Sequence, residues 1–176
     1  MKRLMFTLAL FAVPALAAAQ AAVPAGLTAA AKTQSDQVKG YIVKSAEKMA
    51  EENYAFKPTP EVRSFGALLA HVADANFMLC SRIAGEKSPM GESVEKTKTT
   101  KAELVKALDD AFAYCDGVFA KVTEVNAVEP IDWFGNRKLP RLAGLNMNTM
   151  HNWEHYGNIV TYMRLKGLVP PSSEGR

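Results

Sequence analysis

Three histidines are the residues of this chain whose types and spacing point most directly to chemistry. His151 and His155 are four residues apart, so on a helix both imidazoles lie on one face, one turn from each other. His71 lies in the apolar stripe of a different predicted helix and is expected to point into the protein. Burying three imidazoles without partners is costly, and one shared metal ion satisfies all three. The alternative is that each is an ordinary core histidine with a hydrogen-bond partner inside the protein.

Three nitrogen ligands without an evident fourth side chain describe an open metal site of the catalytic type, completed by water or substrate. Nitrogen ligands suit a divalent Zn, Ni or Fe ion and do not choose between them. The sequence identifies no catalytic acid or base. Side chains that could orient the imidazoles through hydrogen bonds lie on the same two helices; they are Asp74, Asn148, Glu154, Asn158 and Tyr162. The alternative for the two carboxylates is a surface or capping charge, and for the tyrosine it is a buried structural role.

Four amphipathic helices are predicted to carry these residues, and no strand pattern of any length is evident. They are expected at residues 33–53, 64–84, 100–125 and 140–166. Prolines and glycines interrupt the chain between them, and Thr100 with Glu103 has the order of a capping box. The connection at residues 126–140 contains the turn sequence WFGN and is a candidate for a small hairpin.

The connection at residues 85–99 could return along a whole helix, at ~3.3 Å per extended residue. It therefore allows the second and third helices to run parallel. Cys80 and Cys115 lie at nearly the same height only in that arrangement, and a disulfide needs Cα atoms within ~7 Å. The sequence thus predicts a structural disulfide between parallel helices. Two buried free thiols are the alternative.

The N-terminus has the pattern of a secretory signal peptide at residues 1–19. Lys2 and Arg3 precede an apolar run at residues 4–16, and three alanines then form the expected cleavage site. The run is shorter than the ~20 residues of a membrane span, which disfavours the alternative of a retained anchor. Residues 20–32 are rich in alanine and are predicted to be a flexible mature N-terminus.

Composition limits the classes of partner. Removing 19 of the 176 residues leaves 157, a length typical of one domain with a sizeable core. Without Lys2 and Arg3, the 21 basic residues become 19, against 18 acidic residues. This near-neutral chain gives no electrostatic case for a nucleic-acid partner, and no later stretch favours stable membrane insertion after cleavage. The predicted location is the periplasm or the exterior of the cell.

Two motifs resemble the DinB-like (DinB/YfiT) superfamily: SFGALLAHVAD at residues 64–74 and HNWEHYGN at residues 151–158. FKPTPEVR before the first and GLVPPS after the second are also similar to that family, and the resemblance covers roughly residues 33–173. It implies an all-α, four-helix bundle of up-down-down-up topology, with a long crossover between the second and third helices. It also implies a metal held by His71, His151 and His155. Many relatives carry Gln where this chain has Asn158.

Some members of that family are similar to transferases and isomerases that depend on low-molecular-weight thiols. Together with the open site, this implies a metal-dependent transferase or hydrolase for a small molecule, in which the metal lowers the pKa of a thiol or a water. Gly144 and Ala67 are expected to leave room for the substrate. The alternative is a non-catalytic metal-binding or interaction module of the cell envelope. In that case Trp133, Phe134 and Trp153 form a contact surface or a homodimer face.

Overall fold

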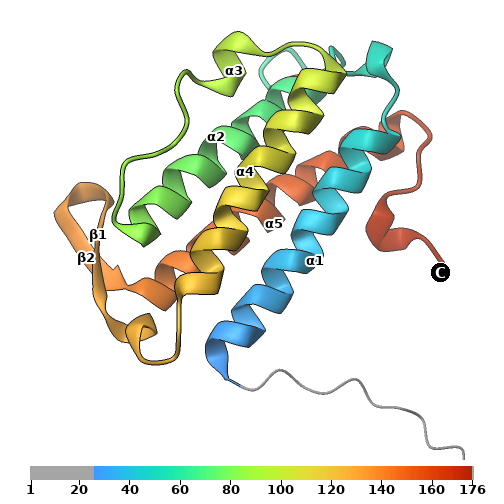
Figure 1. Cartoon of the computed structure of the whole chain (residues 1–176). Coiled ribbons are helices and arrows are strands. Elements are labelled where there is room, and N and C mark those ends of the chain that lie inside the picture. The colour runs from blue at the N-terminus through green and yellow to red at the C-terminus, as the bar shows by residue number, and fades with distance from the viewer. Residues whose placement is uncertain (1–25, 176) are drawn as a thin grey trace, which may run out of the picture.

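The computed structural model describes residues 26–175 and shows a mostly helical protein (Figure 1). Four long helices pack against one another, and a short helix and a two-stranded sheet lie in the connections. The helices are α1 (Leu27–Lys48), α2 (Phe65–Ala84), α3 (Val94–Thr97), α4 (Lys101–Lys121) and α5 (Arg141–Leu165), and the strands are β1 (Pro130–Trp133) and β2 (Arg137–Pro140). The predicted signal peptide, residues 1–19, lies outside the described residues, as do residues 20–25.

Helix α1 begins earlier than the sequence indicated, at Leu27 rather than near residue 33, so residues 27–32, expected to be flexible, are helical. Alanine-rich sequence favours a helix, and a long-range contact fixes its first turn. The backbone N–H and the hydroxyl of Thr28 both donate to Oε1 of Glu124, at 2.8 and 2.6 Å. The helix ends at Lys48 rather than near residue 53, because Met49 has an extended backbone.

Helix α2 begins and ends where the sequence predicted, and the predicted capping box begins α4. The Ser64 side chain accepts a hydrogen bond from the backbone N–H of Ala67, and Gly85 ends α2 in the left-handed conformation, with φ of 73°. Thr100 and Glu103 form both bonds of the capping box at the start of α4. Helix α4 ends at Lys121 instead of residue 125. The unpredicted helix α3 occupies four residues of the connection between α2 and α4.

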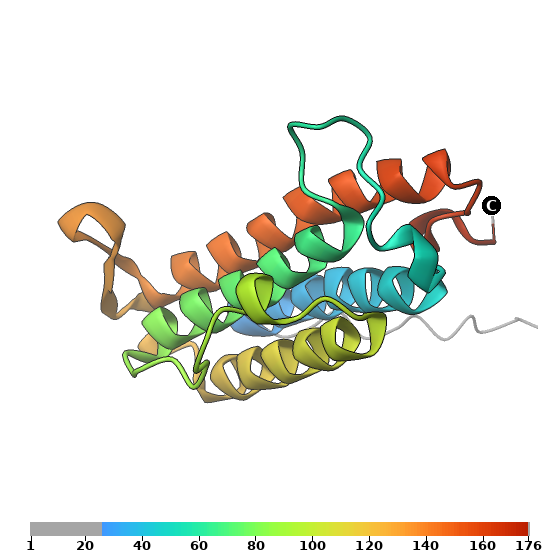
Figure 2. The same cartoon turned by 90° about the horizontal axis from the view of Figure 1, so that it is seen from above.

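The predicted hairpin is present, with β1 and β2 antiparallel and Trp133 opposite Arg137. It projects at the end of the molecule away from the C-terminus (Figure 2). Trp133 is only 5% exposed and belongs to a core cluster. The Arg82 guanidinium lies 4.0 Å from the centre of the Phe134 ring, and Trp153 packs against Tyr41. The three aromatics therefore pack within the molecule and do not form one exposed contact surface.

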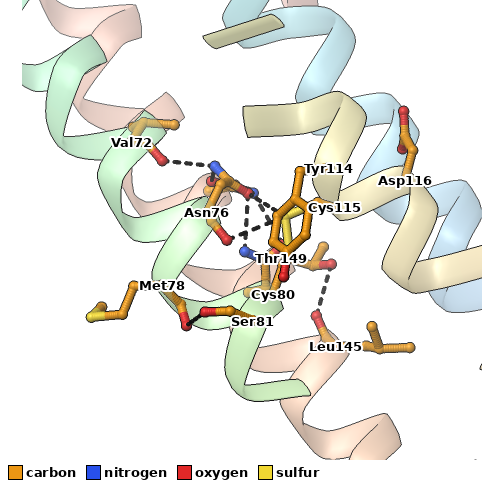
Figure 3. Close-up of a disulfide and its surroundings, with 12 residues drawn as sticks. Val72, Asn76, Met78, Cys80, Ser81, Tyr114, Cys115, Asp116, Leu145 and Thr149 are labelled. Atoms are coloured by element: carbon orange, nitrogen blue, oxygen red, sulfur yellow. Dashed lines mark hydrogen bonds between the residues drawn. A yellow bond between two sulfur atoms is a disulfide. The ribbon is translucent and has the colours of Figure 1, made fainter. Parts of the chain in front are cut away.

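A disulfide joins Cys80 of α2 to Cys115 of α4, with Cα atoms 5.4 Å apart (Figure 3). The predicted pairing is confirmed. Near the other end of the same two helices, the Cβ position of Gly66 would lie 3.1 Å from Cδ1 of Leu104. The first turns of α2 thus lie against the first turns of α4. No helix within residues 26–175 has the length and apolar character needed to cross a membrane.

Candidate metal centre

The three histidines converge between α2 and α5, which lie side by side (Figure 2). His71 comes from α2 and the other two come from α5. One ligand nitrogen from each ring can be chosen so that all three lie within 4.8 Å of one another. The ring centres of His71 and His155 are 4.8 Å apart, and those of His151 and His155 are 4.3 Å apart. The predicted meeting of a single histidine with a pair is therefore present. The nitrogen separations reach 4.8 Å, wider than the ~4.2 Å that two nitrogens bound at ~2.1 Å to one ion can span, so binding an ion requires the rings to move closer together.

The distance between the paired rings fits ligation of one ion. The Nε2 atoms of His151 and His155 are 3.0 Å apart. Two nitrogens bound at ~2.1 Å to a common ion lie ~3.0–3.4 Å apart for bond angles of ~90–110°. The Nδ1 atom of each ring is buried and has no hydrogen-bond partner among residues 26–175. Ring orientation here comes from packing, since the usual acceptor for the second ring nitrogen is not supplied by the described side chains.

The surroundings keep the imidazoles neutral, which is the form that binds a metal. Burial lowers the pKa of His155 to about 4, and the charges of His151, His71 and Arg63 act in the same direction. Burial is also the largest cause of the lowered pKa of His151, followed by the charge of His71. The pKa of His71 is lowered by burial and by the charge of Arg63. The nearby carboxylate of Glu95 acts in the opposite direction and raises it.

Two of the five candidates for orienting the rings act elsewhere in the fold. Asp74 accepts hydrogen bonds from the Ser93 hydroxyl at 2.6 Å and from the backbone N–H groups of Val94 and Glu95 at 2.7 and 3.2 Å. It is the capping charge of α3, supplied from α2. Asn148 donates to Oδ1 of the buried Asn76 at 3.0 Å.

The other three candidates lie nearer the site, but none of them hydrogen-bonds to an imidazole in the described structure. The Tyr162 hydroxyl donates to the backbone carbonyl of Arg63 at 2.6 Å. Glu154 is exposed, and its charge opposes the lowering of the pKa values of His71 and His151. Asn158 is also exposed and lines a cavity that reaches His155.

Two charged residues that the sequence did not indicate lie beside the histidines. Oε2 of Glu95 is 3.8 Å from Nδ1 of His71, and Oε1 of the same carboxylate accepts a hydrogen bond from Nε of Arg63 at 2.9 Å. Glu95 lies in α3, which the Asp74 cap fixes beside α2. No sequence signal pointed to Glu95, because its approach to His71 depends on the path of a polar connection.

Two cavities adjoin the histidines. One of about 470 Å³ reaches His71 and is bounded mainly by apolar surface, including Ala75, Met78 and Met90. The other, of about 650 Å³, reaches His155 and has a more polar lining that includes Arg63. Both volumes are typical of small-molecule sites.

The room that Gly144 was expected to leave for a substrate is filled by protein. A Cβ atom at this position would lie 2.9 Å from Cδ1 of Ile131 and 3.0 Å from Cγ1 of Ile83. The glycine therefore permits close packing between α5, β1 and α2. The space beside the histidines comes instead from the two cavities.

These features define a class of protein: mostly helical, with three histidines placed to hold one metal ion. The chain belongs to the DinB superfamily, whose sequence profile matches residues 34–159. It is 28% identical over 126 residues to the uncharacterized protein YjoA of Bacillus subtilis (strain 168). The aligned region covers 69% of this chain and 79% of YjoA.

Solved structures show the same fold. A DinB-like protein from Bacillus cereus ATCC 10987 matches 80% of this chain and 93% of its own, with a TM-score of 0.69 and 18% identity. The YjoA structure matches 84% of this chain and 99% of its own, with a TM-score of 0.66 and 21% identity. A mycothiol-dependent maleylpyruvate isomerase matches 75% of this chain and 60% of its own, with a TM-score of 0.63 and 16% identity.

Proposed function

We propose that this protein is an exported metal-dependent enzyme that acts on a small molecule, with His71, His151 and His155 as ligands of a divalent Zn, Ni or Fe ion. The observation that carries the proposal is the convergence of three imidazoles from two helices, one of them buried and two partly buried, with pKa values lowered by burial. Three nitrogen ligands leave a coordination position for water or substrate. The adjoining cavities provide space for a reactant of ordinary metabolite size.

The reaction class is transfer or hydrolysis. A divalent ion in this site would lower the pKa of a bound thiol or water and so provide a nucleophile near neutral pH. The thiol version is supported by the fold shared with an isomerase described as mycothiol-dependent. Within the chain, burial holds the rings deprotonated, and Glu95 and Arg63 supply opposite charges at the edge of the site.

We further assign the four long helices the up-down-down-up order. The contact of Gly66 with Leu104 and the bond of Cys80 to Cys115 support parallel α2 and α4. Export to the periplasm or the exterior is proposed from residues 1–19. It is consistent with a disulfide, since disulfides persist in oxidising compartments.

The decisive experiment measures bound metal by mass spectrometry in protein isolated from its native compartment and in His71→Ala. We expect about one ion per chain in the parent and none in the variant, together with loss of any activity found by screening esters, epoxides and thiol–electrophile pairs. Val72→Ala is the matched control, because it truncates the adjacent buried residue of α2 and should lower stability while the ion is retained.

Other results would contradict the proposal at different points. A parent protein without stoichiometric metal rules out the metal centre. Loss of metal in His71→Ala together with lower stability, but with no activity in either protein across the screen, supports a non-catalytic metal-binding module of the envelope.

A further inference from the structure

The two cavities beside the histidines have different chemistry, and each meets the site at a different ring. His71 lines the smaller cavity and His155 lines the larger one. Since the centres of these two rings are only 4.8 Å apart, a molecule bound at the histidines can extend into both. The residues that line each cavity therefore indicate the chemistry of the part of the molecule that would lie in it.

The cavity at His71 offers an apolar surface even though two charged residues contribute to it. The Asp74 carboxylate accepts hydrogen bonds from the Ser93 hydroxyl and from the first backbone N–H of α3, and the Arg82 guanidinium lies over the Phe134 ring. What remains is mainly Met78, of which 41% is exposed, and Met90. Flexible, polarizable methionines suit apolar ligands of varied shape, so this cavity fits a hydrocarbon group.

The cavity at His155 offers a guanidinium that still has free N–H groups. Arg63 lines it, and only Nε of the guanidinium is paired, with Glu95. The two terminal nitrogens have no hydrogen-bond partner within residues 26–175. A guanidinium presents paired N–H groups that match a carboxylate in geometry and charge. Two carboxylates share this lining. Glu95 is paired with Nε of Arg63, and Glu61 is exposed, so solvent and salt screen its charge.

The backbone holds Arg63 in place independently of its side chain. The Tyr162 hydroxyl from α5 donates to the Arg63 carbonyl at 2.6 Å, while the side chain itself is 44% exposed. The guanidinium is thus carried on an anchored backbone next to the histidines and remains accessible to a ligand. This arrangement also means that the side chain can be replaced with little effect on folding.

We propose that the substrate is an amphipathic carboxylate, with its carboxylate on Arg63 and its hydrocarbon part against Met78 and Met90, so that the bonds between the two lie at the histidines. The assignment rests on the proposed function in one respect, namely that the histidines are the reacting centre. Arg63 is then a substrate-binding residue, and Met78 determines specificity for the apolar end.

The test uses octanoate, 1-octanol and acetate as probes, titrated by calorimetry into zinc-loaded and metal-free protein. Octanoate should bind about tenfold or more tightly than either molecule that carries only one of its two features. Arg63→Met should weaken octanoate about tenfold, to the level of 1-octanol. Met78→Glu should weaken octanoate and leave acetate unchanged.

Two controls match these variants. Arg137→Met removes an exposed arginine in the hairpin, and Met150→Glu changes a 62% exposed methionine that lines a different cavity. Both should bind octanoate as the parent does. The inference is overturned if octanoate and 1-octanol bind equally, if octanoate does not bind, or if the control variants lose as much affinity as the test variants.

Metal content measured on the same samples separates this inference from the proposed function. Octanoate binding to metal-free protein that depends on Arg63 and Met78 supports the ligand assignment even if no metal is ever found. Zinc bound at the three histidines without octanoate binding leaves the metal proposal standing and rejects the ligand assignment.

Discussion

The Nε2 atoms of His151 and His155 face each other at 3.0 Å, while the Nδ1 atoms of both rings are buried without a partner in residues 26–175. Such a pair is unfavourable for protonation, because a second imidazolium would lie against the first in a poorly hydrated setting. The same arrangement is favourable for a divalent cation, which both rings can bind in their neutral form.

The metal-free protein should therefore lose stability as the pH falls from 7 to 4. Burial lowers the pKa of His155 to about 4 from an ordinary value of 6.5. Between these values the unfolded chain binds more protons than the folded protein, so the free energy of unfolding decreases with acidification, by up to ~3 kcal/mol from this residue. Urea unfolding at several pH values measures the loss. His155→Gln should flatten the curve over this window, and an unchanged slope would reject the assignment.

Removing the disulfide should lower stability without removing the metal. The bond between Cys80 and Cys115 closes a loop with a sequence separation of 35. For a loop of this size, Cys80→Ala with Cys115→Ala should lower the free energy of unfolding by about 3–4 kcal/mol. Zinc stoichiometry of the folded variant should remain that of the parent, because His71 meets its partners on α5 and not on α4. Loss of zinc from a folded, disulfide-free variant would contradict this separation.

Asp74→Ala should detach α3 from α2 and so free Glu95, which α3 holds beside His71. The substitution removes three accepted hydrogen bonds from Ser93, Val94 and Glu95 and should lower the free energy of unfolding by about 1–3 kcal/mol. Hydrogen exchange of the Val94 and Glu95 amides should accelerate. Asp110→Ala, which removes only an exposed pair with Lys106, is the control and should change stability by less than about 0.5 kcal/mol. Equal exchange at α3 in both variants would show that Asp74 does not hold it.

Two glycines of α5 should respond oppositely to alanine. Gly144→Ala places a Cβ within 3.0 Å of side chains from α2 and β1 and should lower the free energy of unfolding by about 1–3 kcal/mol. Gly157→Ala meets nothing within 4 Å and should raise it by up to ~1 kcal/mol, because alanine favours the helix. Thermal unfolding of the two variants gives the comparison. A Gly144→Ala variant more stable than the parent would contradict this, because it would mean that α5 can move away from β1 and α2 without loss of stability.

The paired histidines were predictable because helical geometry fixes the relation of residues four apart. The approach of His71 was indicated less directly, by its place in an apolar stripe, which says that it is inward but not what it meets. The cysteine pairing followed from the length of one connection and the heights of two residues. Each of these inferences needs only the number of residues per helical turn or the length that a connecting segment can span.

Glu95, Arg63 and the true start of α1 depend on contacts between distant parts of the chain. Helix α3 is four residues long and takes its cap from Asp74, 20 residues earlier than the Val94 amide that it binds. The first turn of α1 is fixed by a bond from Thr28 to Glu124, across a separation of 96 residues. Gly144 shows a further limit, since a small residue can serve close packing as readily as an open site.

Helix α2 has different attachments to its two neighbours. Cys80 joins it to α4 by a covalent bond, and His71, earlier in the same helix, faces α5 through nitrogens that an ion can connect. A reducing agent should consequently weaken the attachment of α2 to α4, whereas a chelator should weaken its attachment to α5. Loss of an ion from the histidines would therefore free α2 only from α5, while the disulfide on its far side keeps α2 attached to α4.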